Sequence, residues 1–327
     1  MIGIDIGGTK TAAALLDAAL VDAAAFGAHA LAHLAVQTNP TPPAAKPAAL
    51  DGLLPGTPAY ERALTDGRAA LLDAVIGLCR ALHALATQRG DVVRGIGIGS
   101  AGQIDPVNGQ VIDANLNLVG WKGTPLAAAV RAATGLPALV DNDVRVMALA
   151  ESSVGAARSF AHVLAITVGT GIGGALILNG RVWHGAHFSA GEIGYLYGKG
   201  GAPIESLYAG PAIERRFALA YPDYGALSLP QIAQRAADGD RTCADWIAAA
   251  ARDLGESLVP ALVLTDPEAL VVGGGVPEIG ALWWDAFTNA IHESPLRAVQ
   301  HLPILPAALG SHAGVIGAGL LALQSLK

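Results

Sequence analysis

The sequence has little of what secreted and membrane proteins need. Only two cysteines, Cys79 and Cys243, occur among 327 residues, and they lie far apart, so we expect buried thiols in a reducing compartment and no disulfide. Glycine, aspartate or arginine interrupts the apolar stretches, so we expect none to reach the roughly 20 residues that span a bilayer. No basic segment followed by an apolar core stands at the start, and no secretory signal is expected.

Aromatic and basic residues are also scarce. Aromatic residues make up 5% of the chain and the formal net charge is −7, which argues against nucleic acid as the main partner. The hydrophobic fraction of 52% comes largely from alanine and glycine. This composition suits small-residue helices packed closely on sheets. We therefore expect a cytoplasmic protein with no membrane or nucleic-acid partner, made of two domains or of one large α/β domain.

The most informative segment is the start of the chain, MIGIDIGGTKT over residues 1–11. A short buried strand that ends in a Gly-Gly turn exposes consecutive backbone N–H groups, which bind phosphate oxygens. Asp5 stands at the end of this strand, where a carboxylate can hold Mg²⁺ directly or through water. A plain hairpin turn gives the same local pattern, and residues 1–28 alternate as a hairpin would.

Glycine turns recur at strand ends along the chain. The apolar patterns predict strands over 92–100, 137–140, 162–167, 175–178 and 269–272, and helices over 60–89, 125–134, 145–154, much of 213–264, and from His312. Prolines between Thr38 and Tyr60 predict a long surface loop, either a linker or a lid. Because strand–Asp–Gly-Gly–strand and strand–Gly-Thr-Gly–strand open the two halves, we expect related halves that face each other across a cleft.

The chain resembles the ROK family of sugar kinases, within the actin-like ATPase superfamily. The resemblance rests on seven ordered segments: DIGGTK (5–10), GIGSAG (97–102), NLVGW (117–121), DND (141–143), TVGTGIGG (167–174), GAHFSAGEIG (185–194) and VVGGGV (271–276). It implies a two-lobed, ribonuclease H-like α/β fold with a nucleotide and sugar cleft between the lobes. Residues 1–118, completed by a helix over 312–327, would form the small lobe, and residues 119–311 the large lobe. It also implies ATP and Mg²⁺ as cofactors, transfer to a hexose hydroxyl (usually the 6-position), and a homodimer.

Two glycine turns are the expected triphosphate ligands, through backbone N–H groups that only glycine lets a phosphate approach closely. They comprise Gly7, Gly8 and Thr9 on one face, and Gly169, Thr170 and Gly171 on the other. Lys10 is either a phosphate ligand or a solvated residue. The resemblance adds Gly274 and Gly275 as part of an adenosine-binding loop.

Asp143 is the expected catalytic base. Phosphoryl transfer depends mainly on positioning and charge neutralisation, but a carboxylate must still accept the proton of the attacking hydroxyl. Asp141-Asn142-Asp143 could also cap the following helix, a role we expect for Asp141. By family position the sugar ligands are Ser100, Ala101, Gly102, Asn117, Asn142, Asp143, Glu192, Tyr195 and Glu205. Trp121 is expected to be a packing residue.

The chain departs from the family at three places. Tyr195 replaces the histidine of the usual Glu-x-Gly-His, and residues 195–205 contain no Cys or His, so no structural zinc is expected. Because tyrosine is longer and neutral, the pocket could take an aminosugar, another hexose epimer or a cyclitol in place of glucose. Arg145 stands where the family often has a small or amide side chain, and either pairs with Asp141 or reaches a phosphate.

Other functional classes fit the sequence less well. A sugar-responsive repressor would need a helix-turn-helix segment before the first strand and a less acidic surface. A kinase-fold sugar-binding protein with weak or no catalysis is the main alternative, although the phosphate turns and Asp143 argue against it. Polyphosphate in place of ATP as the phosphoryl donor stays open.

Overall fold

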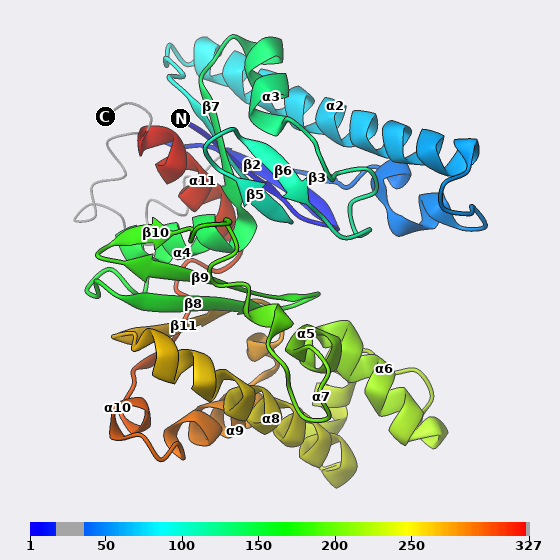
Figure 1. Ribbon diagram of the computed structural model, residues 1–327, viewed down its shortest axis with the longest axis vertical. Helices are drawn as coiled ribbons and strands as arrows, with labels where there is room; N and C mark the ends of the chain where they lie inside the picture. The colour runs from blue at the N-terminus through cyan, green and yellow to red at the C-terminus, as the bar shows by residue number, and fades with distance from the viewer. Residues whose placement is uncertain (18–35, 325–327) are drawn as a thin grey trace. The chain divides into compact units, whose positions relative to one another are not determined.

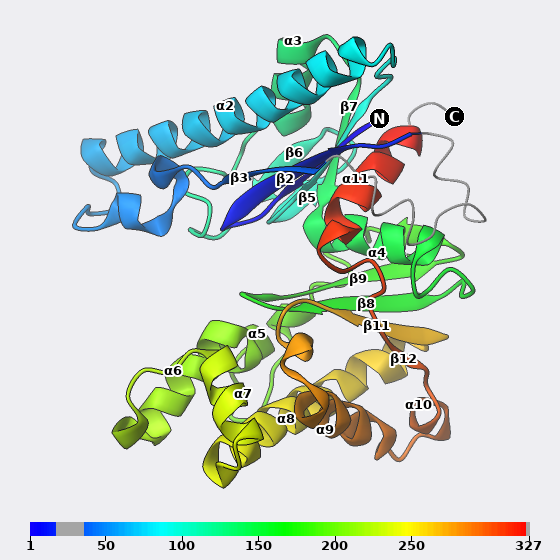
Figure 2. The same cartoon turned by 180° about the vertical axis from the view of Figure 1, so that it is seen from behind.

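The structure is a computed structural model that describes residues 1–17 and 36–324, shown from two sides in Figures 1 and 2. The hairpin expected over 1–28 therefore lies outside the described residues from position 18 on, as does the expected C-terminal helix from position 325 on. The chain forms two compact units. The first comprises Met1–Val154, Gly185–Ser189 and Ser311–Lys327, and the second comprises Gly155–His184 and Ala190–Gly310.

The sheet of the first unit has the strand order β3-β2-β1-β4-β7. Its strands are β1 (Ile2–Ile6), β2 (Lys10–Leu15), β3 (Val36–Pro40), β4 (Ile96–Ser100) and β7 (Ala138–Asn142). β1, β4 and β7 run parallel, whereas β2 and β3 are antiparallel to their neighbours. Because β7 pairs with β4, residues 119–154 belong to this unit, and the first unit continues past the boundary expected after residue 118.

The parallel register brings separate parts of the sequence to one edge of this sheet. Ile6 stands opposite Ser100, and Ser100 stands opposite Asn142. The carboxyl ends of β1, β4 and β7 therefore lie side by side. In α/β sheets this is the edge at which ligands bind.

Helices cover both faces of the first sheet (Figures 1 and 2). On one face lie α2 (Pro58–Gln88) and α3 (Leu126–Thr134), and on the other α4 (Asp143–Val154) and α11 (Ala313–Gln324). α11 lies very close to the strands, because a Cβ at Gly3 would stand 2.0 Å from the carbonyl oxygen of Val315 and one at Gly97 1.7 Å from that of Ala318. Only glycine permits this packing distance.

α2 begins with Thr57, whose side chain accepts a hydrogen bond from the amide of Tyr60. By length and composition α2 is the one helix in the described part of the chain that could cross a membrane, contrary to the expectation that no apolar stretch would suffice. A single helix of this kind is weak evidence for a membrane span. Its Leu71, Val75 and Leu82 are fully buried in the core of the first unit.

The surface loop expected over 38–60 is partly wrong. Thr38–Pro40 belong to β3, an edge strand in which Asn39 pairs with Thr11 of β2. Pro40 ends the strand at the sheet edge, where a missing N–H is tolerated. Two short 3₁₀ turns follow, Pro43–Ala45 and Pro47–Leu50, and connect the edge strand to α2. A small hairpin of β5 (Gln103–Asp105) and β6 (Gln110–Asp113) follows β4.

The second unit repeats the plan of the first sheet, with strand order β10-β9-β8-β11-β12. Its strands are β8 (Val163–Val168), β9 (Ile172–Leu178), β10 (Arg181–Trp183), β11 (Ala269–Gly273) and β12 (Ile304–Pro306). As in the first unit, an antiparallel hairpin is continued by parallel strands. The mixed α/β, two-lobed fold expected from the two glycine motifs is thus confirmed.

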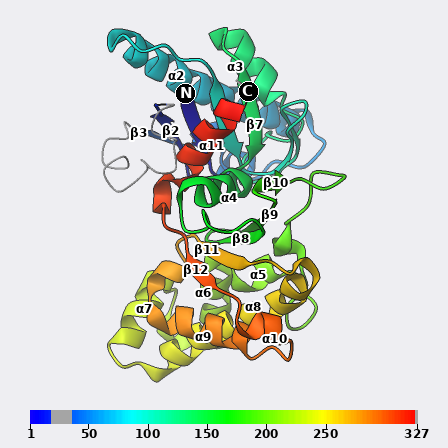
Figure 3. The same cartoon turned by 90° about the vertical axis from the view of Figure 1, so that its left-hand side faces the viewer.

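Helices of the second unit pack against this sheet and one another (Figure 3). They are α5 (Ile204–Tyr208), α6 (Gly210–Ala220), α7 (Leu229–Ala237), α8 (Arg241–Thr265), α9 (Ala281–His292) and α10 (Arg297–Gln300). Leu254, Leu258 and Phe287 form part of a continuous core with the strands. Cys79 and Cys243 are both buried and free, as expected, and burial raises the pKa of Cys79 to about 12.

Candidate functional site

Two carboxylates mark the carboxyl edge of the first sheet. Asp5 lies near the end of β1, and Asp143 begins α4 directly after β7. Burial raises the pKa of Asp5 to about 7, and the charge of Asp143 adds to this effect while Lys10 opposes it. Burial also raises the pKa of Asp143, against the opposing effects of the Val144 amide and Arg145. Two half-buried carboxylates whose pKa values are both raised by burial are typical of a functional site.

The donor set at this edge fits a magnesium ion that arrives with a nucleotide. Mg²⁺ usually binds through one or two carboxylates together with waters and substrate phosphates, and Asp5 offers one such carboxylate. Within residues 1–17 and 36–324 no group of three or more His, Cys, Asp or Glu could hold a metal ion. The segment 195–205 lacks Cys and His, so it does not fit a structural zinc.

Asn142 connects the neighbouring strand ends. Its Oδ1 accepts from the amides of Val144 (2.9 Å) and Arg145 (3.2 Å), and its Nδ2 donates to the carbonyl oxygen of Gly102 at 3.0 Å. Asn142 therefore caps α4, and the expectation that Asp141 does so is wrong. The reason is geometric: Asn142 is the last strand residue, so its side chain faces the free amides of the first helical turn.

The turn after β4 holds three of the expected sugar ligands. Ser100 is fully buried, and its Oγ accepts from Trp121 Nε1 at 2.9 Å while it donates to the carbonyl oxygen of Ala101. Ser100 therefore supports the turn from inside, and Trp121 packs in the core as expected. Ala101 and Gly102 are half-buried. Gly102 has φ +105°, which a side chain rarely adopts.

The first glycine turn connects β1 and β2. The amide of Gly7 donates to the carbonyl oxygen of Lys10 at 3.0 Å, while Gly8, Thr9 and Lys10 are exposed. Thr41, which sequence reasoning missed, fixes the turn: its amide donates to Thr9 O (3.0 Å) and its hydroxyl to Gly7 O (3.1 Å).

Asn117 is exposed and lies beside the first turn. A Cβ placed on Gly8 would meet Asn117 Cβ at 3.6 Å. The structure therefore brings this expected sugar ligand next to the expected phosphate ligands of the same unit.

The second glycine turn, Gly169 to Gly171, connects β8 and β9. The carbonyl oxygen of Gly169 accepts a hydrogen bond from the amide of Gly210 at 2.8 Å. The amide of Val276 donates a hydrogen bond to the carbonyl oxygen of Val168 at 3.0 Å. The latter contact brings the loop of Gly274 and Gly275 against the same turn. Both of these glycines are exposed, and so is Thr170.

The expected sugar ligands of the second unit occupy different environments. Glu205 Oε2 accepts from the amide of Ile172 at 2.9 Å and so binds the second glycine turn, a contact with no sequence signal. Glu192 is half-buried, and Tyr195 is 75% exposed.

The structure shows which partner Arg145 has of the two expected for it, Asp141 or a phosphate. Its Nη1 lies 3.3 Å from Asp141 Oδ1, and its side chain is 1% exposed. It therefore pairs with Asp141 and is not a surface cation. The sequence had indicated this pair but not the burial.

Comparison with known proteins agrees with this geometry. The sequence pattern of the ROK family matches residues 59–325. The chain belongs to the ROK family. A glucokinase from Halalkalibacterium halodurans is 32% identical over 253 residues, which cover 70% of this chain and 76% of that enzyme. An N-acetyl-D-glucosamine kinase from Pasteurella multocida is 28% identical over 247 residues, 70% of this chain and 80% of that enzyme.

A solved ROK structure supports the same assignment. The ROK glucokinase from Streptomyces griseus, in complex with glucose and AMPPNP, superposes with a TM-score of 0.74 at 27% identity and covers 99% of both chains. The fold of this ROK protein is therefore that of the actin-like ATPases, and its class is that of the ATP-dependent sugar kinases.

Proposed function

We propose that this ROK protein transfers the γ-phosphoryl group of ATP to a hydroxyl of a hexose or hexose-like sugar, at the 6-position, with Asp143 as the general base. The observation that carries the proposal is the placement of Asp143. Its half-buried carboxylate stands at the carboxyl edge of the first sheet, near Asp5, at the start of α4 directly after β7, the strand whose end pairs with Ser100. The glucokinase and N-acetylglucosamine kinase relatives support a sugar as the acceptor.

The proposed role of Asp143 is to accept the proton of the attacking hydroxyl and to orient its oxygen toward the γ-phosphorus. The new bond joins sugar oxygen to phosphorus, and ADP leaves with the electron pair of the broken P–O bond. Because burial raises the pKa of Asp143, its carboxylate is a stronger proton acceptor than an exposed aspartate. Gly102, Asn117, Glu192 and Glu205 are the proposed ligands of the other sugar hydroxyls, with Ser100 and Asn142 as supports.

The proposed nucleotide ligands are backbone amides in each unit. Gly7, Gly8 and Thr9, with Lys10, would bind phosphate oxygens in the first, and Gly169, Thr170 and Gly171 in the second, with Gly274 and Gly275 near the adenosine. Asp5 would hold Mg²⁺, which neutralises phosphate charge.

The test is a coupled ADP-release assay with a panel of sugars. We expect Asp143→Asn to lower kcat by about three orders of magnitude or more, since removal of a general base costs roughly 10²–10⁴-fold, while sugar binding by calorimetry changes only a few-fold. Asp113→Asn is the control, because Asp113 is an exposed aspartate of the same unit that pairs with Lys122. Wild-type turnover in Asp143→Asn would remove this residue from the mechanism. Sugar binding without ADP release in the wild type would favour the sugar-binding alternative.

The same panel addresses the acceptor and the donor. Tyr195 is largely exposed where the family has histidine, which motivates the proposal that an aminosugar, another epimer or a cyclitol is preferred over glucose. A clear preference for glucose would contradict this. The same assay with polyphosphate in place of ATP tests which phosphoryl donor the protein uses. We also propose a cytoplasmic homodimer, for which sedimentation equilibrium is the measurement.

A further inference from the structure

We propose that Arg145 is a positioning residue that fixes the segment Gly185–Ser189 as one wall of the sugar pocket. The inference rests on the proposed function for the identity of the ligand. The segment belongs to the first unit although the residues on both sides of it belong to the second. All contacts that carry the inference therefore lie within the first unit.

The burial of Arg145 is the first observation. Its side chain is 1% exposed and that of its partner Asp141 is 3% exposed. A buried ion pair of this kind is weak evidence for stability, since hydrophobic residues of the same volume would pack as well or better. Asp141 also accepts from the amide of Asn142 at 2.8 Å, so the pair is part of the strand end that carries Asn142 and Asp143.

The second observation is where the guanidinium points. Arg145 Nη2 donates to the carbonyl oxygen of Phe188 at 2.6 Å, across 43 positions of sequence. A planar guanidinium can bind Asp141 with one nitrogen and Phe188 with the other, which a lysine ammonium cannot do in the same geometry. Arg145 therefore connects the DND strand end to the segment 185–189.

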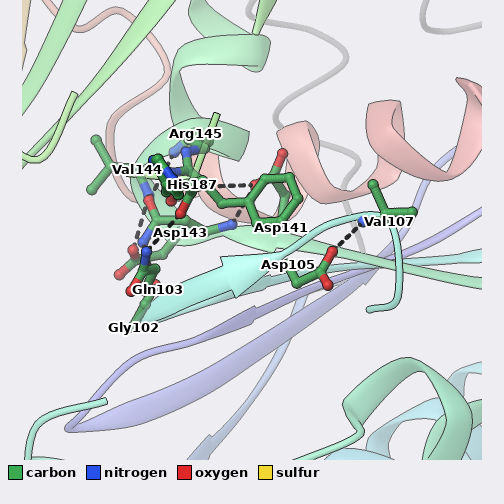
Figure 4. A network of polar contacts seen from close by, with 11 residues as sticks. Gly102, Gln103, Asp105, Val107, Asp141, Asp143, Val144, Arg145 and His187 are labelled. Carbon is green, nitrogen blue, oxygen red and sulfur yellow. Dashed lines mark hydrogen bonds and ion pairs between the residues drawn. The ribbon is translucent and has the colours of Figure 1, made fainter. Parts of the chain in front are cut away.

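The third observation is a second link to the same segment. Gln103 Nε2 donates to the carbonyl oxygen of His187 at 2.8 Å (Figure 4). Gln103 directly follows Gly102, the residue that Asn142 holds. Consecutive carbonyl groups of the segment are thus bound from two elements that follow neighbouring strands: Gln103 begins β5, shortly after β4, and Arg145 lies in the first turn of α4, directly after β7.

The backbone of the segment shows why it needs these contacts. Phe188 has φ +56°, a left-handed conformation that is unfavourable for a bulky residue. Such conformations persist when the surrounding structure holds them, and they cluster at ligand sites. The two side-chain contacts flank this residue. They place the half-buried Phe188 beside the edge at which Gly102 and Asp143 lie.

The test uses two variants that reach the segment independently. Arg145→Lys keeps the buried charge but loses one of the two contacts, and Gln103→Ala removes the His187 contact without any buried charge. Arg131→Ala is the matched control, because Arg131 Nη1 donates to the carbonyl oxygen of Ala138 at the other end of β7. For each we would measure KM for the sugar, KM for ATP, kcat, and amide hydrogen exchange of residues 185–190.

We expect both variants to raise the sugar KM roughly tenfold, the effect of about 1.4 kcal/mol, with KM for ATP and kcat within about threefold. Amide exchange should become faster in 185–190 and stay unchanged in α2. The Arg131→Ala control should leave all four quantities at wild-type values. If both variants kept the wild-type sugar KM, the inference would be wrong although the kinase proposal stood.

The readouts also separate the inference from the proposed function. If wild-type protein phosphorylates no sugar of the panel, the proposed function fails. The exchange measurement then still decides whether Arg145 and Gln103 hold the segment. If Arg145→Lys does not fold, Gln103→Ala alone carries the test, since its contact is exposed and uncharged.

Discussion

The two glycine turns look alike in sequence but differ in how much room they leave. In the second unit a Cβ at Gly171 would lie 2.7 Å from Glu205 Oε2, and one at Gly274 would lie 2.3 Å from the carbonyl oxygen of Val168. In the first unit the nearest atom to a Cβ at Gly8 is 3.6 Å away, an ordinary contact. Position 274, in the loop against the second turn, therefore needs glycine to fold, whereas the clash at Gly171 is with the end of a side chain. Position 8 of the first turn does not need glycine for folding, which leaves the approach of a ligand as the physical reason for glycine there.

The largest expected effect comes from Gly8→Ala and Gly274→Ala, which should separate folding from binding. Gly274 has φ +95° and no space for a side chain, so we expect Gly274→Ala to lower the free energy of unfolding by about 2–4 kcal/mol. Gly8→Ala should change stability by less than about 0.5 kcal/mol but weaken ATP binding by roughly a hundredfold, about 2.7 kcal/mol. Urea unfolding and calorimetry of ATP·Mg²⁺ binding give the two quantities.

Either of two outcomes would break this comparison. Normal ATP affinity in Gly8→Ala would mean that no phosphate approaches that amide. A loss of stability in Gly8→Ala equal to that in Gly274→Ala would mean that both positions need glycine for folding. Gly77→Ala is a control in the middle of α2, where a Cβ meets nothing within 4 Å.

A different carboxylate lies beside each turn, Asp5 at the first and Glu205 at the second. Asp5→Asn tests the carboxylate at the first turn. The pKa of Asp5 is raised from 3.8 to about 7, so native protein binds more protons than unfolded protein between these values. Its stability therefore falls as pH rises through this window. In EDTA and without nucleotide, Asp5→Asn should be more stable than wild type by up to about 4 kcal/mol at pH 8, and the difference should disappear toward pH 4.

Two further measurements sharpen this result. ATP·Mg²⁺ should raise the unfolding temperature of the wild type but not that of Asp5→Asn, because a ligand that binds only the native state raises its stability. Asp105→Asn is the control with opposite sign, since hydrogen bonds from Asn108 lower the pKa of Asp105. Its wild-type stabilisation is present above the unfolded pKa and is lost as pH falls. Equal pH profiles for wild type and Asp5→Asn would contradict the prediction.

The sequence predicted the strands and turns where local chemistry decides them. Apolar runs that end in glycine predicted β1, β4, β8 and β11, and the helical spacing of Leu71, Val75 and Leu82 predicted α2. The strand β3 was missed because Thr38–Pro40 is polar and proline-containing. Its strand character comes from pairing with β2 and not from its own residues.

Contacts between distant residues could not be predicted in the same way. Ser100 ends a glycine-rich strand, and the sequence predicts that it faces a sugar. Instead, the indole N–H of Trp121, 21 positions further along the chain, donates a hydrogen bond to the Ser100 hydroxyl. The partner of Arg145 at Phe188 and that of Glu205 at Ile172 are carbonyl and amide groups, which every residue has. Only the folded chain selects which backbone group stands opposite a side chain.

The smallest expected effect tests the coupling of Glu205 to the second turn. Glu205→Ala leaves the amide of Ile172 without its carboxylate acceptor, so we expect a loss of about 1–2 kcal/mol, whereas Glu205→Gln keeps an acceptor oxygen and should lose less than half of that. Gly171→Ala pushes a methyl group against the same carboxylate. Because shortening residue 205 relieves this clash, the double variant Gly171→Ala/Glu205→Ala should be more stable than the sum of the single effects predicts. Additive free energies of unfolding in this double-mutant cycle would show that Glu205 does not hold the turn.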